Sequence, residues 1–109
     1  MTKRELSGRI TSNFESQLEK QFNAYNFDES EGGRRTFSIH SSAKGHFEFE
    51  WSRTGHTIYS WDSTRHVNPT KEQTQKRNLA IELEKQTQEL LDNIIIEQTA
   101  LYNKIKSQK

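Results

Sequence analysis

The fold class depends most on one segment, residues 46–61, which reads HFEFEWSRTGHTIYSW. Its aromatic residues stand at every second position, and residues 36–40 alternate in the same way just before it. Aromatic and β-branched residues at this spacing are typical of half-buried β-strands. Residues 41–45 read SSAKG and predict a five-residue hairpin loop between the first two strands. These patterns predict a three-stranded antiparallel sheet with one apolar face.

The loop between the second and third strands sets which side chains share that face. Residues 53–55 fit a three-residue loop with glycine at the left-handed position. This loop places three further residues on the face of Trp51, namely Thr57, Tyr59 and Trp61. A two-residue loop would instead place there Ile58, Ser60 and Asp62. We favour the three-residue loop because it keeps the large rings together, with Trp51 and Trp61 partly exposed at the sheet edge.

A first helix is expected before the sheet. Thr2 and Glu5 form a capping-box pattern. Apolar residues then recur every fourth position and predict one helical stripe, made of Leu6, Ile10, Phe14, Leu18 and Phe22. We expect this helix to end near Tyr25, and residues 26–33 (NFDESEGG) to form an acidic turn segment.

A long second helix is expected after the sheet. Asn68 and Pro69 give a strong start signal, because asparagine caps helices and proline favours the first helical position. Neither glycine nor proline follows, which allows a helix of about 60 Å at about 1.5 Å per residue. The prediction is one α+β domain in the order α-β-β-β-α. Residues 1–68 form the helix and sheet, and residues 69–109 form the long helix.

The long helix carries more apolar surface than a three-stranded sheet can cover, since apolar residues crowd positions 79–105. We therefore predict self-association, as a dimer or higher oligomer, in either a parallel or an antiparallel arrangement. The alternative is an intramolecular hairpin in which the first helix packs along the second. The predicted oligomer interface consists of Leu83, Leu90, Leu91, Ile94, Ile95, Leu101, Tyr102 and Ile105.

Composition excludes several classes of function. The chain has 109 residues, no cysteine, a formal net charge of +1 and only 29% hydrophobic residues. The lack of cysteine excludes disulfide frameworks and thiolate zinc sites. We find no signal-peptide pattern, no membrane-spanning apolar run and none of the standard catalytic motifs. The expectation is a cytoplasmic, non-enzymatic protein without cofactor, metal or membrane, located in the host cytoplasm if it is phage-encoded.

The favoured function is therefore that of a small interaction protein, which binds and modulates, for example by inhibition, another macromolecule. Compositional analogy favours an accessory protein of the kind that phages or mobile elements encode. We expect the polar sheet face and hairpin tips to contact an unidentified protein partner, through Lys44, Glu48, Glu50 and Arg53.

Nucleic-acid binding is the first alternative, because basic residues stand near the expected loops and at the start of the last helix. In addition to Lys44 and Arg53, the candidate contacts are Arg34, Arg35, Lys71, Lys76 and Arg77. The α-β-β-β-α order resembles, in topology only, the double-stranded RNA-binding domain, which contacts phosphates from a hairpin loop and its second helix. Its lysine-rich helix start and its Gly-Pro-x-His loop are not reproduced here, and no binding residue follows from the resemblance.

A ligand-binding or catalytic dimer is the second alternative. His40, His46 and Glu48 are expected close together on the polar sheet face, where imidazole and carboxylate groups could hold a metal or exchange protons. An ordinary solvated sheet face is the favoured explanation of these residues, because antiparallel sheets commonly expose one polar face and no ligand motif with specific spacing is present.

Overall fold

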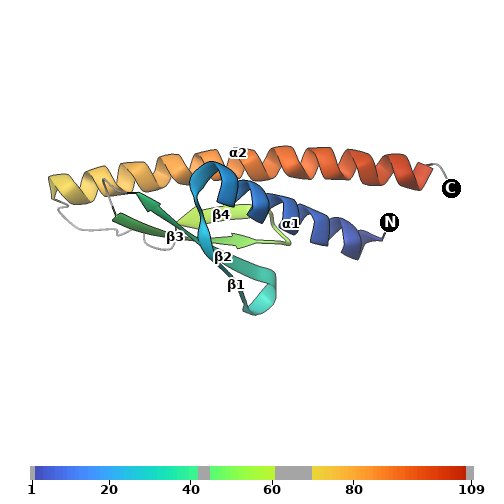
Figure 1. The fold of residues 1–109 in the computed structure, drawn as a ribbon, viewed down its shortest axis with the longest axis horizontal. Helices are drawn as coiled ribbons and strands as arrows, with labels where there is room; N and C mark the ends of the chain where they lie inside the picture. Colours follow the sequence, from blue (N-terminus) through green and yellow to red (C-terminus); the bar gives the residue numbers. More distant parts are fainter. Residues whose placement is uncertain (1, 42–44, 61–69, 108–109) are drawn as a thin grey trace.

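The computed structural model describes residues 2–41, 45–60 and 70–107. In chain order the elements are α1 (Lys3–Phe22), β1 (Tyr25–Ser30), a 3-10 turn η1 (Glu31–Gly33), β2 (Arg34–Ser41), β3 (Gly45–Ser52), β4 (Thr57–Ser60) and α2 (Lys71–Ser107). The strands form one antiparallel sheet in the order β1-β2-β3-β4. Both helices lie on one side of this sheet and run antiparallel to each other (Figure 1). The α+β prediction is confirmed at this level.

The sheet has four strands, so the predicted three-stranded sheet and its α-β-β-β-α order are wrong by one strand. Helix α1 ends at Phe22, earlier than predicted, because Asn23 adopts a left-handed conformation with φ of 55° and its N–H bonds the carbonyl of Glu19. The segment predicted as an acidic turn then forms β1 and η1. Its asparagine, aspartate and glutamate disfavour strands locally, but pairing with β2 holds the segment extended.

The predicted register of the last hairpin is also wrong. Ser52 pairs with Thr57, so four residues, 53–56, form the turn, and Trp51 lies opposite Ile58. The left-handed residue in this turn is His56, with φ of 51°, and not Gly55. An even number of turn residues moves the alternation by one position, which buries Ile58 and turns Tyr59 outward. In the first hairpin, pairing extends to Ser41 and Gly45, inside the predicted loop.

The core lies between the sheet and the helices. Phe14 of α1 contacts Phe37 and Trp51 edge-on, with ring centroids 6.0 and 5.0 Å apart. Phe37 stacks on Phe49 at 5.1 Å. Trp51 is completely buried, contrary to its predicted exposure at the edge, and Trp61 lies outside the described residues. The remaining core side chains are Ile10, Leu18, Ala24, Ile39, Phe47, Ile58, Ala80, Leu91 and Ile94.

Helix α2 begins with a reciprocal cap. The N–H of Gln73 donates to Thr70 Oγ1 at 3.2 Å, and the N–H of Thr70 donates to Gln73 Oε1 at 2.8 Å. The predicted start at Asn68 and Pro69 lies outside the described residues. The helix spans 37 residues, as the absence of glycine and proline predicts.

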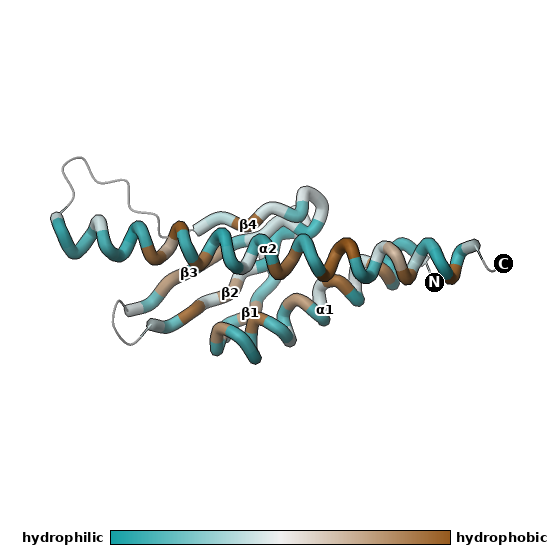
Figure 2. The backbone as a smooth tube through the Cα atoms, turned by 90° about the horizontal axis from the view of Figure 1, so that it is seen from above, coloured by the Kyte–Doolittle hydropathy of each residue, from teal (hydrophilic) through white to brown (hydrophobic). Residues whose placement is uncertain are grey.

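One side of α2 is buried by the chain itself, along a stripe of Ala80, Thr87, Leu91, Ile94 and Gln98. The N-terminal part of this stripe faces the sheet, and the C-terminal part runs beside α1 past the end of the sheet (Figures 1 and 2). Leu91 and Ile94, both predicted interface residues, are therefore core residues of a single chain. Leu83, Leu90 and Ile95 are partly buried against the same core. This part of the arrangement matches the intramolecular alternative.

Side chains of α2 form hydrogen bonds with backbone groups at the edge of β4 that faces away from β3. Gln88 accepts from the Ile58 N–H and donates to the His56 carbonyl, both at 2.8 Å. The side-chain Nε2 of Gln88 also donates to Asp92 Oδ1, at 3.0 Å. The Ser60 N–H donates to Glu84 Oε2 at 3.3 Å. The Gln88 amide thus takes the place of a neighbouring strand, which protects an edge that could otherwise pair with another chain.

Replacing Gln88 by alanine should lower the free energy of unfolding by about 1–3 kcal/mol, because two backbone groups at the β4 edge lose their partner. Urea denaturation measures this loss. Gln86→Ala is the matched control, since Gln86 is exposed on the same helix, and its effect should stay within about 0.5 kcal/mol. Equal effects of the two substitutions would contradict a special role for Gln88.

Candidate binding face

The sheet face turned away from the helices carries the polar residues of the alternating strands. We call it the outer face and define it by its register positions, which are Tyr25, Asp28, Arg34, Thr36, Ser38, His40, His46, Glu48, Glu50, Thr57 and Tyr59. Among the described residues, both helices lie on the opposite side (Figure 1). Tyr25 and Tyr59 are each 37% exposed, which gives this face two accessible aromatic rings.

Glu50 is a buried carboxylate at the β4 side of the outer face, with only 6% of its surface exposed. Tyr59 Oη donates a hydrogen bond to Glu50 Oε1 at 2.6 Å, and Arg34 Nη1 lies 3.4 Å from the same oxygen. Burial of a charged group requires such partners. We predicted that Glu50 binds a partner directly. In the structure its carboxylate instead contacts Tyr59 and Arg34 and orients their side chains.

The hydrogen bond to Glu50 raises the pKa of Tyr59 above its ordinary value of 10.0, and desolvation and the negative charge of Glu50 act in the same direction. The protonated phenol therefore stabilises the fold below pH of about 10, and this contribution is lost as the pH rises through the raised pKa. Spectroscopic titration should show one tyrosine whose ionisation lies above the ordinary pKa of 10.0. That late transition should vanish in Tyr59→Phe but persist in Tyr102→Phe.

A second cluster lies toward the β1 side. Tyr25 Oη is 2.6 Å from His46 Nδ1, and His46 Nε2 is 3.2 Å from Glu48 Oε1. The predicted set of His40, His46 and Glu48 is thus only partly assembled: His40 pairs with His46 in register, but Tyr25 completes the hydrogen-bonded chain. Within the described residues, no group of three histidine or carboxylate side chains is placed to hold a metal ion.

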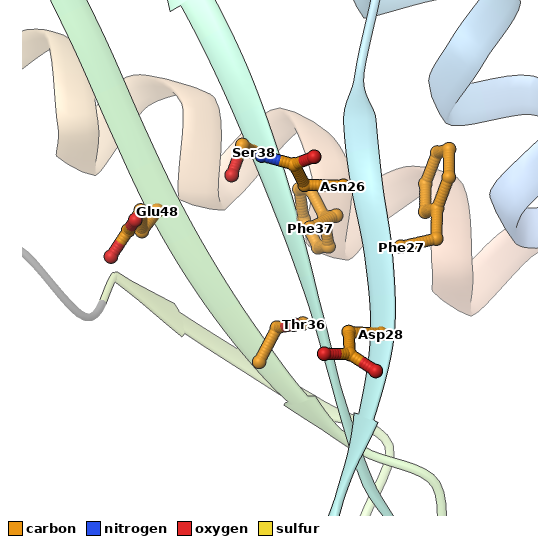
Figure 3. A pocket seen from close by; sticks show the side chains of 7 residues that line it. All are labelled: Asn26, Phe27, Asp28, Thr36, Phe37, Ser38 and Glu48. Carbon is orange, nitrogen blue, oxygen red and sulfur yellow. The ribbon is translucent and has the colours of Figure 1, made fainter.

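A pocket of about 320 Å3 lies beside this cluster, where β1 carries an extra residue. Tyr25 pairs with Ser38, whereas Asp28 pairs with Thr36, so β1 has one residue more than β2 over this interval. Asn26, which lies within this interval, has φ of 56°, in the left-handed region. Figure 3 shows the lining side chains, with Phe27 turned toward α1. The pocket is lined by Asn26, Phe27, Asp28, Thr36, Phe37, Ser38 and Glu48.

The predicted nucleic-acid contacts are not brought together. Arg34 lies on the outer face, whereas Arg35 points to the helix side and pairs with Glu15 at 2.7 Å. Arg53, also a predicted partner contact, pairs with Glu29 at 3.5 Å and donates to Ser7 Oγ at 3.2 Å. These arginines therefore connect structural elements within the chain.

The remaining predicted cations lie elsewhere. Lys71 and Arg77 are exposed at the start of α2, and Lys76 Nζ lies 5.6 Å from the centroid of the Phe47 ring. Lys44 lies outside the described residues. Among the predicted partner contacts on described residues, Glu48 alone is both partly exposed and part of the pocket.

Sequence reasoning missed Tyr25, Asn26 and Asp28 because β1 was not predicted. The available signal was the spacing of Tyr25 and Phe27 at alternate positions before a glycine pair. The extra bulge residue weakens that signal, since Tyr25 and Phe27 no longer share one face. The three residues contribute an aromatic ring, an amide and a carboxylate to the β1 side of the outer face.

No family model, curated protein or solved structure matches this chain. No helix in residues 2–41, 45–60 and 70–107 is both long enough and apolar enough to span a bilayer.

Proposed function

We propose that this chain is a non-enzymatic binding protein whose outer face docks a segment of another protein. The observation that carries the proposal is that one sheet face, which no helix of the described residues covers, presents an accessible tyrosine at each edge strand and a pocket with a partly exposed carboxylate between them. Tyrosines are enriched at protein interfaces because they combine a large apolar ring with a polar end. Three further points stay predictions from composition: that the chain modulates or inhibits its partner, that it is a phage accessory protein, and that it is cytoplasmic.

Two hydrogen-bonded clusters support this use of the outer face. Glu50 holds Tyr59, and His46 holds Tyr25. Both rings are therefore oriented before any partner arrives, which lowers the entropy lost on binding. The nucleic-acid alternative has less support, because Arg35 and Arg53 are engaged in ion pairs away from the outer face.

Site-specific photo-crosslinking tests the proposal in cells that produce the chain. A benzophenone amino acid is placed at His40 or Thr57, both exposed on the outer face, and at Glu82 or Gln86 on the solvent side of α2 as controls. We expect the outer-face positions to yield a discrete crosslinked protein that the α2 positions do not. Crosslinks from α2 alone, or the same crosslinks from all four positions, would contradict the proposal.

We also propose self-association, restricted to the end of the molecule where α1 and α2 run past the sheet (Figure 1). The buried stripe of α2 continues there as Leu101, Tyr102 and Ile105, and Leu101 is 37% exposed. Two helices alone cannot enclose a core, whereas the ends of two chains could combine as four helices. This proposal uses three residues of the predicted oligomer interface and leaves Leu91 and Ile94 in the monomer core.

Light scattering at high micromolar concentration tests this second proposal. We expect a mass of twice the 12.8 kDa of one chain. Leu101→Glu should reduce it to that of one chain, while Ile96→Glu should not, because Ile96 is 68% exposed on a different side of α2. A monomeric wild-type chain, or equal effects of both substitutions, would contradict it.

A further inference from the structure

We propose that the pocket at the β1 bulge binds the guanidinium group of an arginine side chain carried by a segment of the partner protein. The inference rests on the proposed function, since it names the chemistry by which the outer face holds its partner. The pocket, of about 320 Å3, has two carboxylates on its lining, and none of its described lining residues is a cation. A positively charged group is therefore the complementary ligand.

Ser38 provides an independent indication of a ligand. The residue is 95% buried, with 5% of its surface exposed, and it lines the pocket between Asn26 and Glu48 (Figure 3). No hydrogen bond of its side chain to another described residue is found. Its Oγ is not among the fully enclosed side-chain atoms of the described residues that lack a partner, so it is accessible from the pocket and can take a hydrogen-bond partner there. A donor entering the pocket would supply one for the Ser38 hydroxyl.

The carboxylates are available on two sides of this hydroxyl. Asp28 Oδ1 accepts only the N–H of the adjacent Glu29, at 2.8 Å, within the described residues. Glu48 Oε1 contacts His46, and its side chain remains 47% exposed. Asp28 comes from β1 and Glu48 from β3, so the acceptors lie on either side of β2.

This distribution of acceptors favours guanidinium over ammonium. A guanidinium group presents five N–H donors in one plane and can contact several separated acceptors at once, whereas an ammonium group is a compact point charge. The neighbouring Tyr25, paired with Ser38 in register, adds an accessible ring that can attract the cation. Four of the polar lining residues, Asp28, Thr36, Ser38 and Glu48, occupy register positions of the outer face, where a docked segment would present its side chain.

The test is a titration of the isotope-labelled chain of 109 residues with N-acetyl-arginine amide, followed by NMR of the backbone amides. N-acetyl-citrulline amide, which has nearly the same shape without the charge, and N-acetyl-lysine amide are the matched ligands. We expect saturable shifts around Asn26, Ser38 and Glu48 with the arginine compound, weaker shifts with lysine and none with citrulline. Equal responses to arginine and citrulline, or tighter binding of lysine, would overturn the inference.

Variants assign the binding to the named residues, and the same spectra show that each variant is folded. Asp28→Asn and Glu48→Gln should each weaken arginine binding at least about tenfold, because each removes a charge-assisted contact. Ser38→Ala should weaken it about threefold, through the loss of one neutral hydrogen bond. Glu72→Gln, which removes an exposed charge on α2, should leave binding unchanged. A loss as large in Glu72→Gln as in Asp28→Asn would overturn the inference.

The outcomes separate this inference from the proposed function. Crosslinks from His40 and Thr57 without any arginine binding would overturn the guanidinium pocket and leave the proposed function supported. Arginine binding that depends on Asp28 and Glu48, together with crosslinks from α2 alone, would support the guanidinium pocket and contradict docking on the outer face.

Discussion

Replacing Ile94 by glutamate is expected to unfold the chain. Ile94 is 7% exposed and belongs to the core between α1, α2 and the sheet. A carboxylate at this position would be buried without a partner, and the isoleucine side chain would also lose its packing. The expected cost is about 4–5 kcal/mol, most of the stability of a small domain, and circular dichroism with urea denaturation measures it.

Ile96→Glu is the control, because the two isoleucines lie two residues apart on the same helix. Ile96 is 68% exposed, on the solvent side of α2. Its substitution should change the free energy of unfolding by no more than about 0.5 kcal/mol. If Ile94→Glu remained folded and only dissociated an oligomer, then the stripe of α2 would be an interface between chains, as the sequence suggests, and not the core of one chain.

Phe14→Ala should destabilise the chain by about 3–5 kcal/mol, since it removes a buried ring and leaves a cavity. Phe14 is completely buried and is the α1 ring that contacts both Phe37 and Trp51. Phe22→Ala offers a comparison, because Phe22 is only partly buried at the end of the same helix, and its loss should cost about half as much. Denaturant unfolding that ranks Phe22 above Phe14 would contradict the described core.

Much of the fold follows from local pattern. The four-residue spacing from Leu6 to Phe22 predicts α1, and the spacing correctly identifies its buried positions, Ile10, Phe14 and Leu18. The alternation through residues 36–40 and 46–51 predicts β2 and β3, because large rings at every second position need a core on one side only. These elements are predictable since each one's apolar periodicity is complete within its own sequence.

The missing parts depend on contacts between distant segments. Residues 25–30 contain few strand-forming residues and become β1 through pairing with β2. The β4 register depends on the turn length, and a four-residue turn with His56 left-handed cannot be distinguished from a three-residue turn by glycine placement alone. Leu91 and Ile94 are buried because α1 runs alongside α2. The apolar pattern of α2 alone does not show that α1 will lie there.

In the candidate site, too, residues on strands with a clear local pattern were predicted, whereas residues placed by contacts between distant segments were not. Glu48 was predicted as a partner contact and lies in the pocket. Glu50 was predicted as equivalent to Glu48, since both share one strand face, but the register with Tyr59 and the approach of Arg34 bury it. Asp28 and Tyr25 enter the site only because the β1 strand exists. Three of the seven residues that line the pocket, Asn26, Phe27 and Asp28, could therefore not be predicted while residues 26–33 were interpreted as a turn.

The central claim is that the outer face docks a protein partner, and hydroxyl-radical footprinting of the three tyrosines tests it most directly. Tyr25 and Tyr59 lie on the outer face, while Tyr102 lies on α2 and serves as an internal reference. With the crosslinked partner added in excess, the oxidation rates of Tyr25 and Tyr59 should fall severalfold and that of Tyr102 should stay constant. Protection of Tyr102 without protection of Tyr25 and Tyr59 would contradict the claim.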